Sequence, residues 1–121
     1  MENRLEIARL FSGGKFDQVA DSLSDAVEFH IYEAHKHLIG NAEVLGFCKG
    51  IAEYFASIET DFKVSGTVAS DGKVVIYGYG EFKRDGVLVN AVHSCDVYEF
   101  DADGLIFQIH AYCNSRQFED D

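Results

Sequence analysis

The sequence predicts a single α+β domain, in which three helices from the first half of the chain cover a strongly curved antiparallel sheet and enclose a pocket. Apolar residues in the first half recur mainly with helical spacing. The second half is dense in Val, Ile, Tyr and Phe and is divided by three Asp-Gly pairs, which is typical of strands joined by hairpin turns. With 121 residues, the chain can bury one core but is too short for two domains.

Each predicted helix is based on an apolar pattern. The first covers residues 5–11 and ends at the Gly-Gly pair 13–14. The second, over 16–23, has apolar residues at the i, i+3, i+4 and i+7 spacing. The third begins at Asn41, a suitable N-cap, and its apolar stripe continues to about residue 58. These three helices are the elements available to cover the sheet.

Five strands are predicted. Residues 26–32 alternate between apolar and polar side chains, which indicates a half-buried strand, and a loop follows as far as Gly40. The other four strands are separated by the Asp-Gly turns and cover residues 62–70, 73–84, 87–101 and 104–113. A typical strand has about five or six residues, so a strand as long as 87–101 must coil and bend. Because helices pack imperfectly over a bent sheet, we expect a mainly apolar pocket on its concave face.

Charge and composition exclude several classes of partner. The formal net charge of −11 repels phosphate backbones and anionic lipid surfaces, and the ten Lys and Arg residues do not cluster. We therefore expect neither nucleic acid nor a membrane as a partner, and no stretch approaches the roughly 18 apolar residues of a membrane span. The N-terminus lacks the pattern of a secretory signal, which favours a cytoplasmic protein. Residues 116–121 are expected to form a flexible tail.

The cysteines and histidines do not predict a metal site. Cys48, Cys95 and Cys113 are odd in number and lack paired ligand spacing, so free thiols are expected. His35 and His37 would place two imidazoles on one side of an extended segment, but two ligands do not make a site. Neither a metal nor a cofactor is therefore predicted.

Two segments carry a resemblance to a known family: SDAVEFHIYEAHKHLIGNAEVLGFC (24–48) and CDVYEFDADGLIFQIHAYCN (95–114). The first resembles the acidic turn, strand, loop and long helix of the NTF2-like superfamily, and the second is similar to its final hairpin. This superfamily contains the ketosteroid isomerases and the SnoaL-like polyketide cyclases. The resemblance covers nearly all of the chain. It implies a cone-shaped fold around a pocket and a homodimer formed through the outer face of the sheet. Since one fold hosts many chemistries, the resemblance implies no single function.

The ketosteroid isomerase site is matched only in part. The resemblance aligns its oxyanion-hole aspartate with Asp96, which is followed by Val97 as in the family. Its general base falls on Ile31, or on His30 if the loop is one residue longer, and its helix-borne tyrosine falls on Ile7. An isoleucine neither abstracts nor donates a proton. Steroid isomerase activity is therefore not supported.

Asp96 is the first candidate for a catalytic residue. Alternation along its strand places it on one face with Ser94 and Tyr98, and the resemblance implies that this face is turned inward. In an apolar pocket the pKa of a carboxyl is expected to rise, because burial destabilises the ionised form. The alternative is that Asp96 faces solvent, or that it is bonded to a Tyr, a Ser or a backbone group in a purely structural role.

His30 is the second catalytic candidate, since histidine titrates near neutrality. Alternation places both His30 and His93 on the outer face, where they would be surface or dimer-face residues, unless a bend or bulge reverses the direction. The residues expected to line the pocket are Phe29, Ile31, Phe47, Ile51, Tyr54, Val92, Ser94, Tyr98, Ile109, Ala111 and Cys113.

The second long strand carries glycines and tyrosines in alternation. Gly78 and Gly80 either widen the pocket or mark a bend or bulge in the strand. On the opposite face, Tyr77 and Tyr79 would form an aromatic surface suited to a protein interface. This pattern favours the homodimer that the resemblance implies.

Two functions from different classes remain open. The first is an enzyme that performs cofactor-free acid–base chemistry on a small apolar molecule, as an isomerase, cyclase, dehydratase or hydrolase. In it Asp96 would be the acid or base, and the polar partners would be Tyr54, Ser94 and Tyr98. The alternative is a non-catalytic dimer that binds a small ligand or another protein. A carboxyl that faces an apolar cavity costs stability, and this favours the enzyme.

Overall fold

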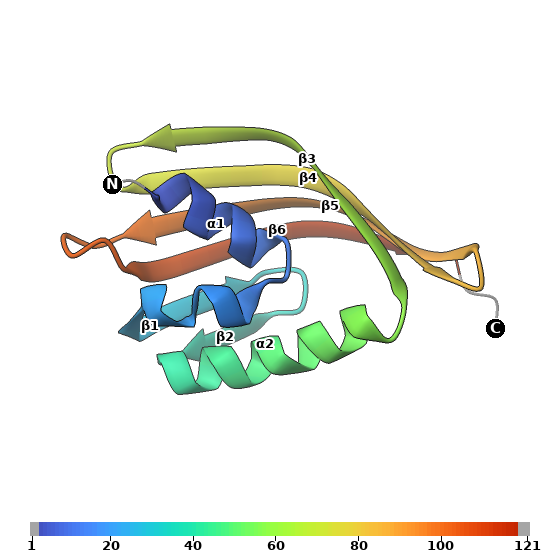
Figure 1. Cartoon of the computed structure of the whole chain (residues 1–121), viewed down its shortest axis with the longest axis horizontal. Coiled ribbons are helices and arrows are strands. Elements are labelled where there is room, and N and C mark those ends of the chain that lie inside the picture. The colour runs from blue at the N-terminus through green and yellow to red at the C-terminus, as the bar shows by residue number, and fades with distance from the viewer. Residues whose placement is uncertain (1–2, 119–121) are drawn as a thin grey trace.

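The computed structural model describes residues 3–118 and contains one curved six-stranded sheet, with two α-helices packed on one of its faces (Figure 1). The elements are α1 (Arg4–Ser12), η1 (Phe16–Gln18), η2 (Ala20–Ser22), β1 (Leu23–Ile31), β2 (Lys36–Ile39), α2 (Asn41–Ala56), β3 (Glu59–Ser70), β4 (Lys73–Arg84), β5 (Val87–Phe100) and β6 (Ile106–Gln117). The strand order is β2-β1-β6-β5-β4-β3. Only β1 and β6 are parallel neighbours; the other neighbouring strands run antiparallel. The predicted α+β class with a curved sheet is confirmed.

The four long strands follow one another through the three predicted turns. Gly72, Gly86 and Gly104 have φ angles of 69°, 80° and 82°, a region that glycine adopts without steric cost. The pairing of β3 with β4 is interrupted by a register shift between Val64 and Gly66. Such an irregularity bends a strand and increases its twist.

Gly78 of β4 lies opposite this irregularity in β3. A Cβ atom at Gly78 would collide with the backbone carbonyl oxygen of Lys63, so the glycine allows β3 and β4 to approach closely. Of the two explanations that the sequence left open for this position, the structure therefore favours the bulge over a widened pocket.

The prediction of three helices is wrong, because the described residues form only two α-helices. Residues 16–23 instead form the two short 3₁₀-helices η1 and η2 and the first residue of β1. Phe16, Val19 and Leu23 are buried, as their spacing indicates. A spacing of about three residues suits a 3₁₀ turn as well as an α-helix, so the pattern identifies the buried side chains but not the helix type.

The segment predicted as a histidine-containing loop contains a strand. Lys36–Ile39 pairs antiparallel with β1 and forms one edge of the sheet. With four largely exposed residues, β2 has too little apolar alternation to be recognised from sequence.

Phe11 is the central contact between α1 and the sheet. Its side chain is buried and meets the rings of Phe16, Phe29 and Tyr98 edge to face, with ring centroids 4.9, 5.6 and 5.8 Å away. Edge-to-face pairs at these distances stabilise the folded state by more than the burial of their apolar area alone. The core therefore lies between α1, α2 and the inner face of the sheet.

The end of the chain differs in part from the prediction. β6 continues to Gln117, so the first residues of the expected tail belong to a strand. Residues 119–121 of that tail lie outside the described residues. Within residues 3–118, no helix is long and apolar enough to cross a membrane.

Candidate active site

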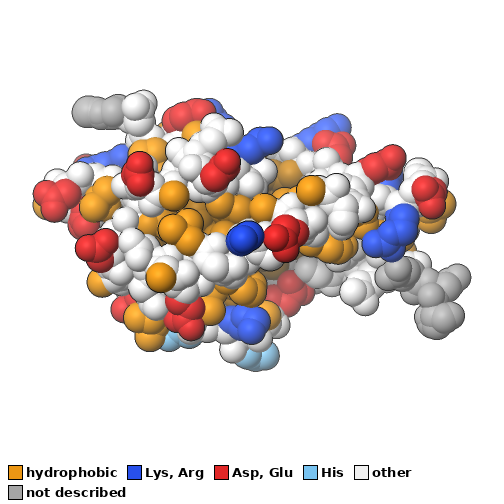
Figure 2. Space-filling view, turned by 60° about the horizontal axis from the view of Figure 1, so that its bottom comes forward, with side chains coloured by type: hydrophobic (Ala, Val, Ile, Leu, Met, Phe, Trp, Pro, Cys, Tyr) orange, Lys and Arg blue, Asp and Glu red, His pale blue; other side chains and the backbone are white. Residues whose placement is uncertain are grey.

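A cavity of about 240 Å³ lies between α1, α2 and the inner face of the sheet. The structure places along it every predicted lining residue except Tyr54, namely Phe29, Ile31, Phe47, Ile51, Val92, Ser94, Tyr98, Ile109, Ala111 and Cys113. Asp96 borders the same cavity. In a space-filling view, hydrophobic side chains gather along the middle of one face of the molecule, with acidic and basic side chains around them (Figure 2).

Tyr54 does not border the cavity. The cavity-facing residues of α2 are Phe47, Ile51 and Phe55, which are spaced by four and therefore share one face of the helix. Tyr54 is 41% exposed, and its ring packs against those of Phe55 and Phe82. Position 54 is one residue away from the stripe, and this rotates its side chain to the edge of the helix.

Asp96 is hydrogen-bonded to the end of α1. The Ser12 hydroxyl donates to Oδ2 of Asp96 at 2.8 Å and lies 2.6 Å from the hydroxyl of Tyr98. Asp96 and Tyr98 are two residues apart on β5, so both side chains point toward the same helix. Among residues 3–118, Ser12 is the only side chain that hydrogen-bonds Asp96.

The proton positions in these two hydrogen bonds follow from which of the three groups can donate. An ionised carboxylate can only accept hydrogen bonds, so the Ser12 hydroxyl uses its single proton toward Asp96. Tyr98 must then donate to the Ser12 oxygen. Tyr98 therefore donates to Ser12, and Ser12 donates to Asp96. Each of these hydrogen bonds polarises the next.

Burial raises the pKa values of the ionisable groups around the cavity. The pKa of Asp96 is raised to about 6 by burial, and the hydrogen bond from Ser12 opposes this rise. Burial and the nearby Asp96 carboxyl raise the pKa of Tyr98 well above its ordinary value, and burial raises the pKa of Cys113 to about 11. Tyr98 and Cys113 are therefore protonated at neutral pH, whereas Asp96 changes its charge close to it.

Ser12 is absent from the predicted site although it is the direct partner of Asp96. It is the last residue of α1, four positions after the buried Ala8, and thus lies on the helix face turned toward the sheet. This i, i+4 relation was the available signal. It is weak, because a serine next to a Gly-Gly pair is usually part of a helix end.

Ser12→Ala should raise the pKa of Asp96 further above about 6, because the variant removes the hydrogen bond that favours the ionised form. It also leaves the Tyr98 hydroxyl without its acceptor. The measurement is a ¹³C NMR titration of the aspartate carboxyl groups, with Asp96→Asn to assign the signal. Ser94→Ala is the matched control, since Ser94 lines the cavity without a hydrogen bond to Asp96. An unchanged or lower pKa in Ser12→Ala would contradict the role given to this bond.

The two histidine candidates lie outside the cavity. His30 is on the opposite face of the sheet, where its Nε2 atom is 2.8 Å from Oε1 of Gln108. His93 is exposed, and its ring lies 4.7 Å from that of Tyr79. Strand alternation thus holds at both positions, and no bend turns either ring inward. Asp96 and His30 are not brought together.

All three cysteines are free thiols. Cys48 is fully buried in the core, where burial raises its pKa to about 12. Burial also raises the pKa of Cys95, and the charge of the neighbouring Asp96 adds to the effect. A raised pKa keeps a thiol protonated and a poor nucleophile.

The comparisons with known proteins agree with this fold. Neither a known family model nor a curated protein sequence matches the chain. Among solved structures, an NTF2-like protein of unknown function from Cytophaga hutchinsonii is 26% identical, with a TM-score of 0.79 over 90% of this chain and 94% of that one.

More distant structures share the fold alone. A candidate SnoaL-like polyketide cyclase from Shewanella putrefaciens is 14% identical, with a TM-score of 0.71 over 93% of this chain and 80% of that one. An LEH-like epoxide hydrolase from M. tuberculosis is 16% identical, with a TM-score of 0.67 over 92% of this chain and 82% of that one. The chain therefore shares the fold of the NTF2-like and SnoaL-like proteins among these structures.

Proposed function

We propose that the cavity binds a small, largely apolar molecule and that Asp96 performs cofactor-free acid–base chemistry on it. The observation that carries this proposal is a carboxyl with a pKa of about 6 in a cavity lined mainly by apolar side chains. General bases work best when their pKa lies close to the working pH. Titratable groups with strongly shifted pKa values inside clefts are frequent in active sites.

The volume of the cavity limits the size of the ligand. A cavity of about 240 Å³ is slightly below the usual range for ligand pockets and has room for about eight water molecules. This corresponds to a molecule of roughly ten non-hydrogen atoms, such as a substituted six-membered ring. Several aromatic walls, including those of Phe29, Phe47 and Phe62, would contact its apolar surface.

The chemistry would centre on proton transfer at the free oxygen of Asp96. With a pKa of about 6, roughly nine of ten molecules carry an ionised Asp96 at pH 7. The carboxylate would remove a proton from the substrate or from a water molecule, while its other oxygen is held by Ser12, whose hydroxyl is in turn bonded to Tyr98. Isomerisation, cyclisation, dehydration and hydrolysis all need such a step. The fold neighbours described as polyketide cyclases and as an epoxide hydrolase support this range of reactions.

Asp96→Asn is expected to lower turnover by about 10²–10⁴-fold, the usual contribution of a general base. Styrene oxide tests hydrolysis, and 3-cyclohexen-1-one tests isomerisation to the conjugated ketone; both are small, mainly apolar molecules. His93→Ala is the matched control, because His93 lies outside the cavity. If Asp96→Asn keeps more than half of the wild-type rate on a turned-over substrate, Asp96 is not the acid or base.

The second candidate is a non-catalytic module that binds a small ligand. One observation favours it: Asp96 is the only carboxyl, and there is no imidazole, among the described residues that line the cavity. A binder predicts that a ligand co-purifies in native mass spectrometry, and that neither probe is turned over. It also predicts that Asp96→Asn binds the same ligand with unchanged affinity.

We also propose that two chains associate through the outer face of the sheet. Tyr32, Tyr77 and Tyr112 are 42%, 44% and 50% exposed there, and tyrosine is enriched in protein interfaces. Sedimentation equilibrium of the wild type and of Tyr77→Lys tests this, since a charge at the centre of an interface weakens it.

A further inference from the structure

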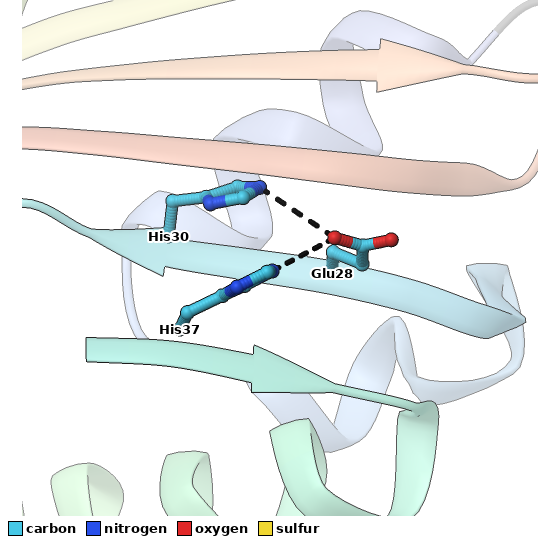
Figure 3. Close-up of side chains that lie close together, drawn as sticks. All are labelled: Glu28, His30 and His37. Carbon is cyan, nitrogen blue, oxygen red and sulfur yellow. Dashed lines mark hydrogen bonds and ion pairs between the residues drawn. The ribbon is translucent and has the colours of Figure 1, made fainter.

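A cluster of one carboxylate and two imidazoles lies on the outer face of the sheet, on the side opposite to the cavity. Glu28 and His30 are two residues apart on β1, so both point to the same face. His37 of β2 is the direct antiparallel partner of His30. The close-up shows all three side chains turned toward one another, with both histidine rings directed at the carboxylate of Glu28 (Figure 3).

The potential ligand atoms are close together. His37 Nε2 lies 2.7 Å and His30 Nε2 4.0 Å from the same Oε1 atom of Glu28. One potential ligand atom from each residue lies within 4.8 Å of those from the other two. This convergence depends on the β1–β2 register, since a slip of one residue would move His37 to the other face.

We propose that Glu28, His30 and His37 bind one divalent first-row transition metal ion, with Zn²⁺ as the probe. Two imidazole nitrogens and one carboxylate oxygen are a ligand set found in zinc sites and in iron(II) sites. In a tetrahedral site with metal–ligand distances of 2.0–2.2 Å, the ligand atoms lie roughly 3.3–3.6 Å apart. The separation of 2.7 Å must widen and that of 4.0 Å must shorten, each by less than about 1 Å, which side-chain rotation can supply.

A fourth ligand is available from the neighbouring strand. Gln108 of β6 is the parallel partner of Glu28, and its Oε1 atom is 2.8 Å from Nε2 of His30. Either this amide oxygen or a water molecule would complete the coordination. The site is open to entry from solvent, because the side chains of His30, Glu28 and His37 are 20%, 35% and 47% exposed.

The surroundings hold the rings in place. The ring of His30 is stacked between those of His37 and His110, with centroids 4.2 and 4.8 Å away. His110 is in turn held by Glu99, whose Oε2 atom is 3.0 Å from its Nε2. Partners of this kind orient metal ligands before the ion arrives. The net charge of −11 adds a general attraction for cations.

A metal ion bound at this site would stabilise the edge of the sheet that β2 forms. β2 has only four residues, and His37 is its contribution to the cluster. An ion shared between β1 and β2 would hold this short strand against its neighbour, so the folded state should gain stability when the ion binds. Because the cluster and the cavity are on opposite faces, this inference does not depend on the proposed function.

The test is calorimetric titration of ZnCl₂ into the full chain, after removal of metals with EDTA and dialysis at pH 7.5. We expect one Zn²⁺ per chain and a higher melting temperature in its presence. His37→Ala and Glu28→Gln should each weaken binding at least tenfold, and the glutamine keeps the size of the glutamate side chain. Binding should also weaken at pH 5.5, since protons compete for the imidazoles.

His35→Ala and His93→Ala are the matched controls, because both histidines are exposed and lie outside the cluster. Both should bind Zn²⁺ as the wild type does. Circular dichroism establishes that each variant is folded. The proposal is overturned if the wild type shows no saturable binding up to 100 μM Zn²⁺, if His37→Ala and Glu28→Gln bind as tightly as the wild type, or if either control loses binding.

Discussion

Asp96→Asn should be more stable than the wild type at pH 7.5, by roughly 2–3 kcal/mol. The carboxyl has a pKa of about 6 in the folded protein, compared with an ordinary value of 3.8. Each unit of such a shift corresponds to about 1.4 kcal/mol. Asparagine has nearly the same shape, has no ionised form to bury, and can still accept the hydrogen bond from Ser12.

The pH dependence of this gain has a defined sign. Between pH 3.8 and about pH 6, the folded state binds more protons at Asp96 than the unfolded state does. Wild-type stability contributed by this group therefore falls as the pH rises through that window, and the cost stays constant above it. The difference between Asp96→Asn and the wild type should be near zero at pH 3.5, should grow up to about pH 6, and should then level off.

Urea unfolding of both proteins from pH 3.5 to 8 measures this difference. Asp61→Asn is the control, since the Asp61 side chain is 62% exposed and pairs only weakly with Lys63 at 3.8 Å. Asp61→Asn should show no gain in stability over the wild type that grows with pH. A destabilised Asp96→Asn at pH 7.5, or a difference that does not change with pH, would mean that burial of the ionised carboxyl costs the fold little.

A gain in stability combined with a loss of turnover would be the signature of a functional residue. Groups held in unfavourable surroundings reduce stability, and they are found mainly where chemistry or binding requires them. The hydrogen-bonded series Tyr98–Ser12–Asp96 alone does not separate function from structure, because a hydrogen-bonded carboxyl can also be structural. The two measurements on one variant separate these roles.

The inner face of the sheet could be predicted because strand alternation is a local rule. Once β5 is recognised as a strand, Ser94, Asp96 and Tyr98 must share a face, and the structure places all three along the cavity. The same rule assigned His30 and His93 to the outer face. The turns were equally local, because Asp-Gly specifies a hairpin through the backbone conformation that glycine allows.

The remaining features depend on contacts between distant segments. Ser12 reaches Asp96 only because α1 crosses β5, a contact between residues 84 positions apart that no local pattern contains. Likewise, the cluster of Glu28, His30 and His37 requires β2, which is defined by its pairing with β1 rather than by its own sequence. Residues 16–23 show the same limit, since their apolar spacing fits both kinds of helix.

Phe11→Ala is expected to destabilise the protein by about 3–5 kcal/mol, the usual cost of removing a buried phenylalanine ring. The ring is 4% exposed and contacts Phe16, Phe29 and Tyr98, so its loss leaves a void that these neighbours cannot fill without moving. Urea unfolding at pH 7.5 measures the change. Tyr54→Ala is the control: its ring is 41% exposed, and a loss of no more than about 1 kcal/mol is expected.

The same variant tests how α1 is held over the cavity. Phe11 directly precedes Ser12 and borders the cavity itself, so removing its ring both enlarges the cavity and weakens the anchor that aligns Ser12 with Asp96. Benzene should therefore raise the melting temperature of Phe11→Ala more than that of the wild type, because an apolar void of this kind binds small apolar molecules. If Phe11→Ala loses less than about 1 kcal/mol of stability and benzene does not change its melting temperature, the sheet closes over the void. In that case the position of Ser12 would have to depend on the hydrogen bonds to Asp96 and Tyr98, rather than on the packing of the helix.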